Sequence, residues 1–154
     1  MSKLYRLRHE QRFPTDRNAL WDFIATPNNL AAITPPSMRF ETLHGGGEAM
    51  FPGQVIAYRL RPLPGWKTSW VTEITHMENG RYFVDEQRFG PYAFWHHLHR
   101  LDDVPGGVKM TDTVHYKIPF DFLGNWVNAL VVKKKLDEIF AYRRRKMETL
   151  FGRL

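Results

Sequence analysis

Apolar and polar residues alternate with a period of two along much of the chain. In residues 54–60, for example, Ile56, Tyr58 and Leu60 fall on one face. Such alternation is typical of strands with one buried side. The segments that show it are residues 3–13, 38–44, 54–60, 67–76, 81–89, 93–102 and 108–118. Tight-turn sequences such as Asn79-Gly80 connect the later segments, so the pattern predicts a curved antiparallel sheet of about seven strands.

The remaining segments show helical signals. Thr15 or Asp16 can cap a short helix over residues 16–25, and residues 28–33 fit a second one that ends before two prolines. Farther along, the apolar spacing becomes that of an amphipathic helix. Its apolar positions are Leu123, Val127, Leu130, Val131, Leu136, Ile139, Phe140, Met147, Leu150 and Phe151. We therefore expect one long C-terminal helix.

This order of elements predicts an α+β helix-grip fold in a single domain over residues 1–154. A curved meander cannot bury its concave face against itself, and the long helix is the only predicted element large enough to cover it. A chain of 154 residues with 43% hydrophobic and 14% aromatic residues fits one domain with one core. We expect the sheet to wrap around the helix, with a small-molecule cavity between them.

Polar side chains fall on the predicted inner faces of three consecutive strands. They are Asp85, Gln87, His97, His99 and Asp112, and they share these faces with Phe83, Phe89, Trp95, Leu101, Met110, Val114, Tyr116 and Ile118. Because strands joined by hairpins lie side by side, we expect the five polar residues to form one group. A buried polar group without a partner costs about 1–3 kcal/mol, so each must pair with a neighbour, water or a ligand.

Three roles fit this polar group. Its members could pair with one another and order the sheet, they could orient a ligand, or they could catalyse a reaction. The candidate catalytic residues are His97, His99, Asp85 and Asp112, since a histidine beside an aspartate can titrate near neutral pH. Two histidines and a carboxylate could also form a facial triad for a metal. Two histidines and a carboxylate on strands are a far less specific sign of a metal site than a helical histidine pair with a catalytic glutamate. We therefore predict no metal and no cofactor.

Composition excludes several kinds of chemistry. The absence of cysteine excludes disulfides, thiolate metal sites and a cysteine nucleophile.

Residues 1–13 contain no apolar stretch of signal-peptide length, and the chain has no run of about 18 apolar residues. We therefore expect a cytoplasmic protein without a transmembrane segment.

The net charge of +6 is concentrated near the C-terminal end. The basic residues there are Lys133, Lys134, Lys135, Arg143, Arg144, Arg145, Lys146 and Arg153, against the acidic residues Asp137, Glu138 and Glu148. A basic helix face can bind RNA, an acidic protein or an anionic membrane. It is also typical of the solvated outer side of an amphipathic helix, which we favour. Aromatic residues for base stacking are not evident beside it, so nucleic-acid binding is not expected.

Several short stretches carry a resemblance to a known superfamily. They are residues 27–30, 33–36, 83–87, 90–91, 95–99, 107–116 and 139–143. Together with the order of elements, they resemble the START/Bet v 1-like superfamily, also called SRPBCC, over nearly the whole chain. The similarity is greatest to a bacterial group related to polyketide cyclase/dehydratase and coenzyme Q-binding proteins. The resemblance implies the helix-grip fold and a hydrophobic ligand, whereas only some branches are enzymes.

We therefore expect the protein to bind a hydrophobic small molecule (a lipid, an isoprenoid or a polyketide-like compound) between the sheet and the helix. The expected ligand-binding residues are Tyr58, Trp70, Phe83, Asp85, Gln87, Trp95, His97, His99, Asp112, Val114, Tyr116, Leu136 and Phe140. The alternative is an enzyme of the cyclase, dehydratase or hydrolase kind that uses the histidines and aspartates. The sequence identifies neither the ligand nor the oligomeric state.

Overall fold

Seven strands form one antiparallel sheet in the order β1-β7-β6-β5-β4-β3-β2. They are β1 (Tyr5–Phe13), β2 (Glu41–His44), β3 (Val55–Leu63), β4 (Trp66–Glu78), β5 (Tyr82–Phe89), β6 (Phe94–Val104) and β7 (Gly107–Lys117). The structure is a computed structural model that describes residues 3–47, 49–119 and 125–154. From β2 to β7 each strand pairs with the next along the chain, whereas β1 pairs with β7. The predicted antiparallel meander is therefore confirmed.

One long helix and three short ones complete the described fold. α1 (Arg17–Ile24) is capped by Asp16, whose side chain accepts a hydrogen bond from the Ala19 backbone N–H at 2.9 Å. The 3₁₀ helices η1 (Pro27–Ile33) and η2 (Pro36–Met38) each begin at a proline, which is favoured in a first turn. The long helix is α2 (Asn125–Phe151). Its predicted start at Leu123 and the predicted role of the Val127 side chain lie outside the described part of the chain.

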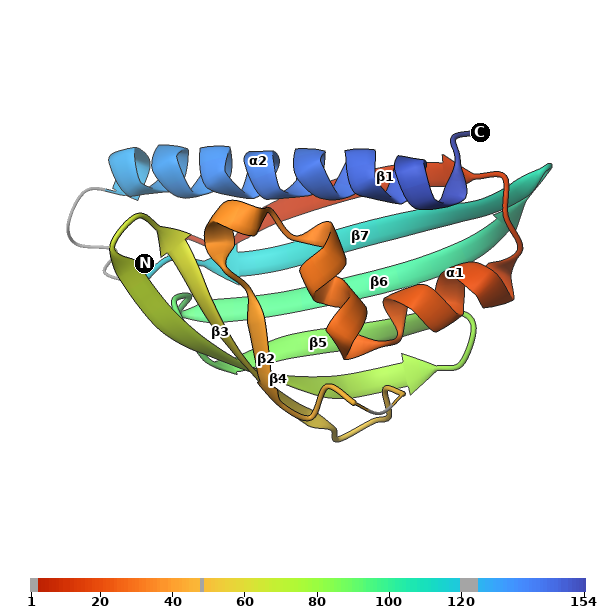
Figure 1. The fold of residues 1–154 in the computed structure, drawn as a ribbon. Coiled ribbons are helices and arrows are strands. Elements are labelled where there is room, and N and C mark those ends of the chain that lie inside the picture. Colours follow the sequence, from red (N-terminus) through yellow and green to blue (C-terminus); the bar gives the residue numbers. More distant parts are fainter. Residues whose placement is uncertain (1–2, 48, 120–124) are drawn as a thin grey trace.

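α2 lies lengthwise along the concave side of the curved sheet and contacts β1 (Figure 1). Leu136, Phe140 and Met147 are buried on it, and we call these three residues the apolar stripe of α2. α1 packs on β6, η2 contacts β3, and η1 contacts both α2 and β2. The short helices therefore connect the long helix to the β2 edge of the sheet. This arrangement confirms the predicted helix-grip fold. None of the helices in the described residues is long and apolar enough to cross a membrane.

Several local expectations are wrong. Leu130, Val131 and Leu150 were expected on the apolar face of the long helix, but they are 74%, 52% and 52% exposed. The strand predicted from residue 38 begins only at Glu41, because Pro36 starts η2 and Arg39 then adopts a left-handed conformation with φ of 44°. Phe89, expected on the inner face, is 65% exposed. Gln87 lies opposite Thr72 and Phe89 lies opposite Val71, so β5 carries one extra residue there. A β-bulge of this kind interrupts the alternation of side chains and turns Phe89 outward.

Candidate functional site

A cavity of about 440 Å³ lies between the sheet, α2 and the short helices. Side chains from η1, η2, α2 and strands β3 to β7 line it, and most of them are apolar. The volume falls within the range of about 300–1,000 Å³ that is typical of small-molecule pockets. The cavity thus occupies the expected position between the sheet and the long helix.

Ten of the thirteen predicted ligand-binding residues line this cavity. They are Tyr58, Trp70, Phe83, Asp85, Trp95, His97, His99, Asp112, Leu136 and Phe140. They come from β3, β4, β5, β6, β7 and α2, so residues of six consecutive elements meet at one surface. Strand alternation and helical spacing together were sufficient to predict their common orientation.

The other three predicted residues do not line the cavity. The Gln87 side chain donates to the backbone carbonyl of Tyr92 at 2.7 Å and accepts from its N–H at 3.2 Å, so it holds the turn between β5 and β6. Val114 is fully buried in the core. Tyr116 packs against the rings of Tyr5 and Tyr92, with centroids 5.4 and 5.9 Å away.

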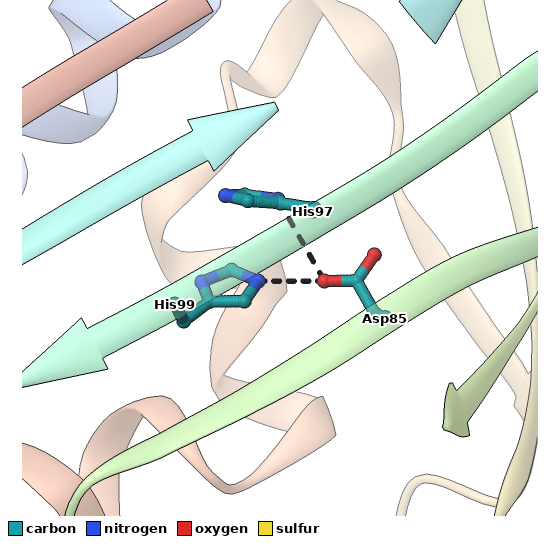
Figure 2. Close-up of side chains that lie close together, drawn as sticks. All are labelled: Asp85, His97 and His99. Carbon is teal, nitrogen blue, oxygen red and sulfur yellow. Dashed lines mark hydrogen bonds and ion pairs between the residues drawn. The ribbon is translucent and has the colours of Figure 1, made fainter. Parts of the chain in front are cut away.

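Four of the lining side chains form a connected polar group, which we call the His/Asp ring: Asp85, His97, His99 and Asp112. The central strand β6 supplies both histidines, β5 supplies Asp85 and β7 supplies Asp112. Asp85 lies directly opposite His97, and Asp112 lies directly opposite His99. Figure 2 shows the two imidazoles side by side, with Asp85 next to both. The pleat of three adjacent strands therefore brings the ring together.

Within the His/Asp ring, His99 has a carboxylate on each side. Its Nε2 is 2.6 Å from Asp85 Oδ2 and its Nδ1 is 3.0 Å from Asp112 Oδ1. His97 Nε2 is 2.8 Å from Asp112 Oδ1, whereas its Nδ1 is 3.6 Å from Asp85 Oδ2. Because an ionised carboxylate only accepts hydrogen bonds, the two flanking carboxylates favour a proton on each nitrogen of His99, which is the imidazolium form. His97 needs a proton only on Nε2.

Burial and pairing act in opposite directions on the pKa values of the histidines. Burial lowers the pKa of His99, but its hydrogen bonds to Asp112 and Asp85 outweigh burial and raise that pKa above its ordinary value. The pKa of His97 is lowered, first by burial and then by the positive charge of His99. These shifts favour the charged form of His99 and the neutral form of His97.

The aspartates show the same competition. Burial raises the pKa of Asp112, but hydrogen bonds from both histidines outweigh it and hold that pKa well below its usual range. For Asp85, burial is outweighed by the hydrogen bond from His99 and by the charges of nearby basic groups, so its pKa is also lowered. Two carboxylates and one imidazolium leave the His/Asp ring with one net negative charge.

This protonation state is testable by NMR. At about pH 7 we expect both ring nitrogens of His99 to carry protons and His97 to carry one on Nε2, measured from imidazole ¹⁵N shifts. Replacing Asp85 by asparagine should lower the pKa of His99, since one accepting carboxylate is lost. A neutral His99 at this pH, or an unchanged pKa in the variant, would contradict the assignment.

Asp85, His97 and His99 also resemble a metal triad. One ligand atom of each lies within 4.8 Å of the other two, which suits a single ion. However, Asp85 Oδ2 and His99 Nε2 already bond to each other at 2.6 Å. A metal would have to replace the proton between them. We therefore interpret the group as a hydrogen-bond network.

Two basic residues that were expected on the solvated face of α2 line the cavity instead: Lys135 and Arg143. Arg143 follows Phe140 by three residues and precedes Met147 by four, so it continues the apolar stripe of α2. Its charge suggested the outer face, whereas this spacing is the signal that indicates the inner one.

A third histidine lies beside the His/Asp ring and was not predicted. His9 of β1 is paired in register with Asp112, and its imidazole stacks on Phe140 with a centroid distance of 4.6 Å. Burial lowers the pKa of His9. Alternation with Phe13 and Gln11, which are both buried, is the sequence signal that places it on the inner face.

Comparison with known proteins supports the fold. No family model matches the sequence, and neither does any curated protein. Protein CV1439 from Chromobacterium violaceum is similar in structure, with a TM-score of 0.72 and 11% identity over 96% of this chain and 98% of that one. Ginseng major latex-like protein 151 from Panax ginseng has a TM-score of 0.69 and 13% identity over 96% and 97%. Protein Ms6760 from Mycobacterium smegmatis has a TM-score of 0.67 and 17% identity over 94% and 89%.

These identities are too low to show more than the fold. The neighbours include Bet v 1-like proteins, so the chain has the Bet v 1-like helix-grip fold that the sequence resemblance implied. A shared fold does not transfer a ligand or an activity.

Proposed function

We propose that this chain, which has the Bet v 1-like helix-grip fold, binds a hydrophobic small molecule in the cavity between the sheet and α2. The observation that carries the proposal is the cavity itself, with its volume of about 440 Å³ and a wall that is largely apolar. Protein interiors normally pack as densely as organic crystals, so a space of this size in the core is not expected from packing alone. Apolar walls with a few converging polar groups are how small-molecule pockets are built.

The aromatic residues of the wall support this proposal, because they pack against one another instead of filling the cavity. Trp70 meets Trp95 and Tyr92 edge-on, with ring centroids 5.1 and 5.6 Å apart, and Tyr92 lies 4.8 Å from Trp95. Such contacts hold large side chains in fixed positions. The three rings form a rigid part of the wall against which an apolar ligand can pack.

A neutral fluorescent probe tests the proposal. Titration with N-phenyl-1-naphthylamine should give a blue-shifted, saturable signal with one site per chain, and dodecanol should displace the probe. Both compounds are uncharged, so the basic residues of α2 contribute little to either result. A signal that rises without saturation, or that dodecanol does not reduce, would overturn the proposed function.

The His/Asp ring does not favour the alternative that the protein is an enzyme. Each of its four side chains bonds to another member, as a structural network requires. A general base needs a free acceptor that can reach the substrate, but Asp112 already pairs with both histidines, and the unprotonated Nδ1 of His97 faces Asp85 Oδ2 at 3.6 Å. We therefore interpret the ring as a polar part of the cavity wall that orders β5, β6 and β7.

Acidic residues of α2 neutralise part of its basic surface. Lys133 bonds to Asp137 at 2.8 Å, and Arg144 lies 3.5 Å from Glu148. Both pairs are one turn apart on the helix and are typical of a solvated helix face. We therefore do not propose that α2 binds RNA, an acidic protein or a membrane.

A further inference from the structure

Two basic residues of α2, Lys135 and Arg143, line the cavity, and Arg143 is the one that continues the apolar stripe of the helix. It lies on the same side of the helix as Leu136, Phe140 and Met147, and all four residues line the cavity. Burial of an arginine among apolar side chains is costly unless its guanidinium finds an acceptor. The question is therefore which acceptor Arg143 serves.

The described residues offer no acceptor to one of its nitrogens. Nε of Arg143 is buried and has no hydrogen-bond partner among them. The guanidinium carbon lies over the Phe140 ring at 5.0 Å from the centroid, which holds the group in place. By contrast, the neighbouring Arg144 has Glu148 beside it and donates to the backbone carbonyl of Glu10. Arg143 is thus positioned, but one of its donors is unsatisfied.

The acidic residues nearest the cavity do not supply this acceptor. Asp85 and Asp112 accept hydrogen bonds from His97 and His99, and neither forms an ion pair with Arg143 in the described structure. The second cation of the wall, Lys135, is 28% exposed and its amine is 3.7 Å from Glu138. Arg143 is therefore the cavity-lining cation whose guanidinium has a buried donor without an acceptor and no ion pair in the described part of the chain.

We propose that the ligand is an amphipathic carboxylate, with its apolar body in the cavity and its carboxylate on the guanidinium of Arg143. This inference rests on the proposed function. A guanidinium matches the two oxygens of a carboxylate, and a charge-assisted hydrogen bond is stronger than a neutral one. A singly charged head group suits the site better than a doubly charged phosphate, because the carboxyl groups of Asp85 and Asp112 line the same cavity.

The test compares two ligands of equal chain length, dodecanoate and dodecanol, by displacement of N-phenyl-1-naphthylamine. We expect the wild-type protein to bind dodecanoate about tenfold more tightly than dodecanol. In Arg143→Met, dodecanoate should lose about tenfold in affinity while dodecanol binds as before. Arg143→Lys should keep part of the preference, since the charge remains but the planar fork does not.

Arg145→Met is the matched control, because Arg145 is exposed on the same helix and does not line the cavity. It should leave both affinities unchanged. If both ligands bind but Arg143→Met weakens them equally, or if the preference survives in Arg143→Met, the carboxylate inference is overturned and the binding function stands. If neither ligand displaces the probe from the wild-type protein, the proposed function itself fails.

Discussion

Replacing Asp112 by asparagine should lower the free energy of unfolding by about 3 kcal/mol, and the melting temperature by about 9 °C. Asp112 is only 3% exposed, and its Oδ1 accepts from both His97 and His99. An asparagine has the same shape as an aspartate but no charge. Its amide NH2 group is a hydrogen-bond donor, so it cannot accept from the N–H groups of the histidines. The imidazolium of His99 would then be buried with a single carboxylate. Chemical denaturation at about pH 6 measures the loss directly.

The pH dependence of this loss has a definite sign. Because the pKa of Asp112 is lowered, its contribution is present above about pH 3.9 and is lost as the pH falls through the depressed pKa. Because the pKa of His99 is raised, its contribution is present below about pH 6.5 and is lost as the pH rises through the raised pKa. The difference between the variant and the wild type should therefore be largest between these limits.

Asp137→Asn provides the comparison for Asp112→Asn. Asp137 bonds to Lys133 on the surface of α2, with 44% of its side chain exposed. Exposed pairs at this spacing contribute about 0.3–0.5 kcal/mol, so this variant should be nearly as stable as the wild type. Equal losses in the two variants would show that Asp112 is not part of a buried charged network.

Replacing Ile139 by tryptophan should weaken binding of N-phenyl-1-naphthylamine by about thirtyfold. Ile139 is half-buried, lines the cavity and lies one turn from both Lys135 and Arg143. The larger ring takes up space that the ligand would otherwise occupy, and a thirtyfold loss of affinity corresponds to about 2 kcal/mol of binding free energy. The free protein should be no less stable, because the new side chain enters an existing cavity.

Leu150→Trp makes the same change outside the cavity. Leu150 is also on α2, is 52% exposed and does not line the cavity. This variant should bind the probe as the wild type does. An unchanged affinity in Ile139→Trp would instead place the bound probe elsewhere on the protein.

The sequence predicted most of the fold because the signals that define it are local. Alternation places Ile56, Tyr58 and Leu60 together, and all three are buried. The structure differs from the predicted strands at places where a single residue changes the local backbone geometry. Arg39 adopts a left-handed conformation, and the bulge before Phe89 turns that side chain outward. Neither feature follows from a periodic pattern.

The candidate site was predictable in part for the same reason. Alternation on β5, β6 and β7 was enough to group the members of the His/Asp ring, but it could not specify which nitrogen bonds to which oxygen. Those contacts depend on register, which the pattern does not determine. For Arg143, two signals in the sequence disagree. Its spacing from Phe140 and Met147 places it on the inner face of the helix, whereas its charge predicts a position in solvent. The size of the cavity depends on how α2 sits on the sheet, which only the structure provides.

The most direct test of ligand binding in the cavity uses the indole N–H signals of the protein in a ¹H–¹⁵N NMR spectrum during titration with dodecanol. Trp70 and Trp95 line the cavity, whereas Trp21 is buried but does not line it. We predict that the signals of Trp70 and Trp95 shift together and saturate at one dodecanol per chain, while the Trp21 signal stays in place. Unchanged signals for Trp70 and Trp95, or shifts that do not saturate, would contradict a binding site between the sheet and α2.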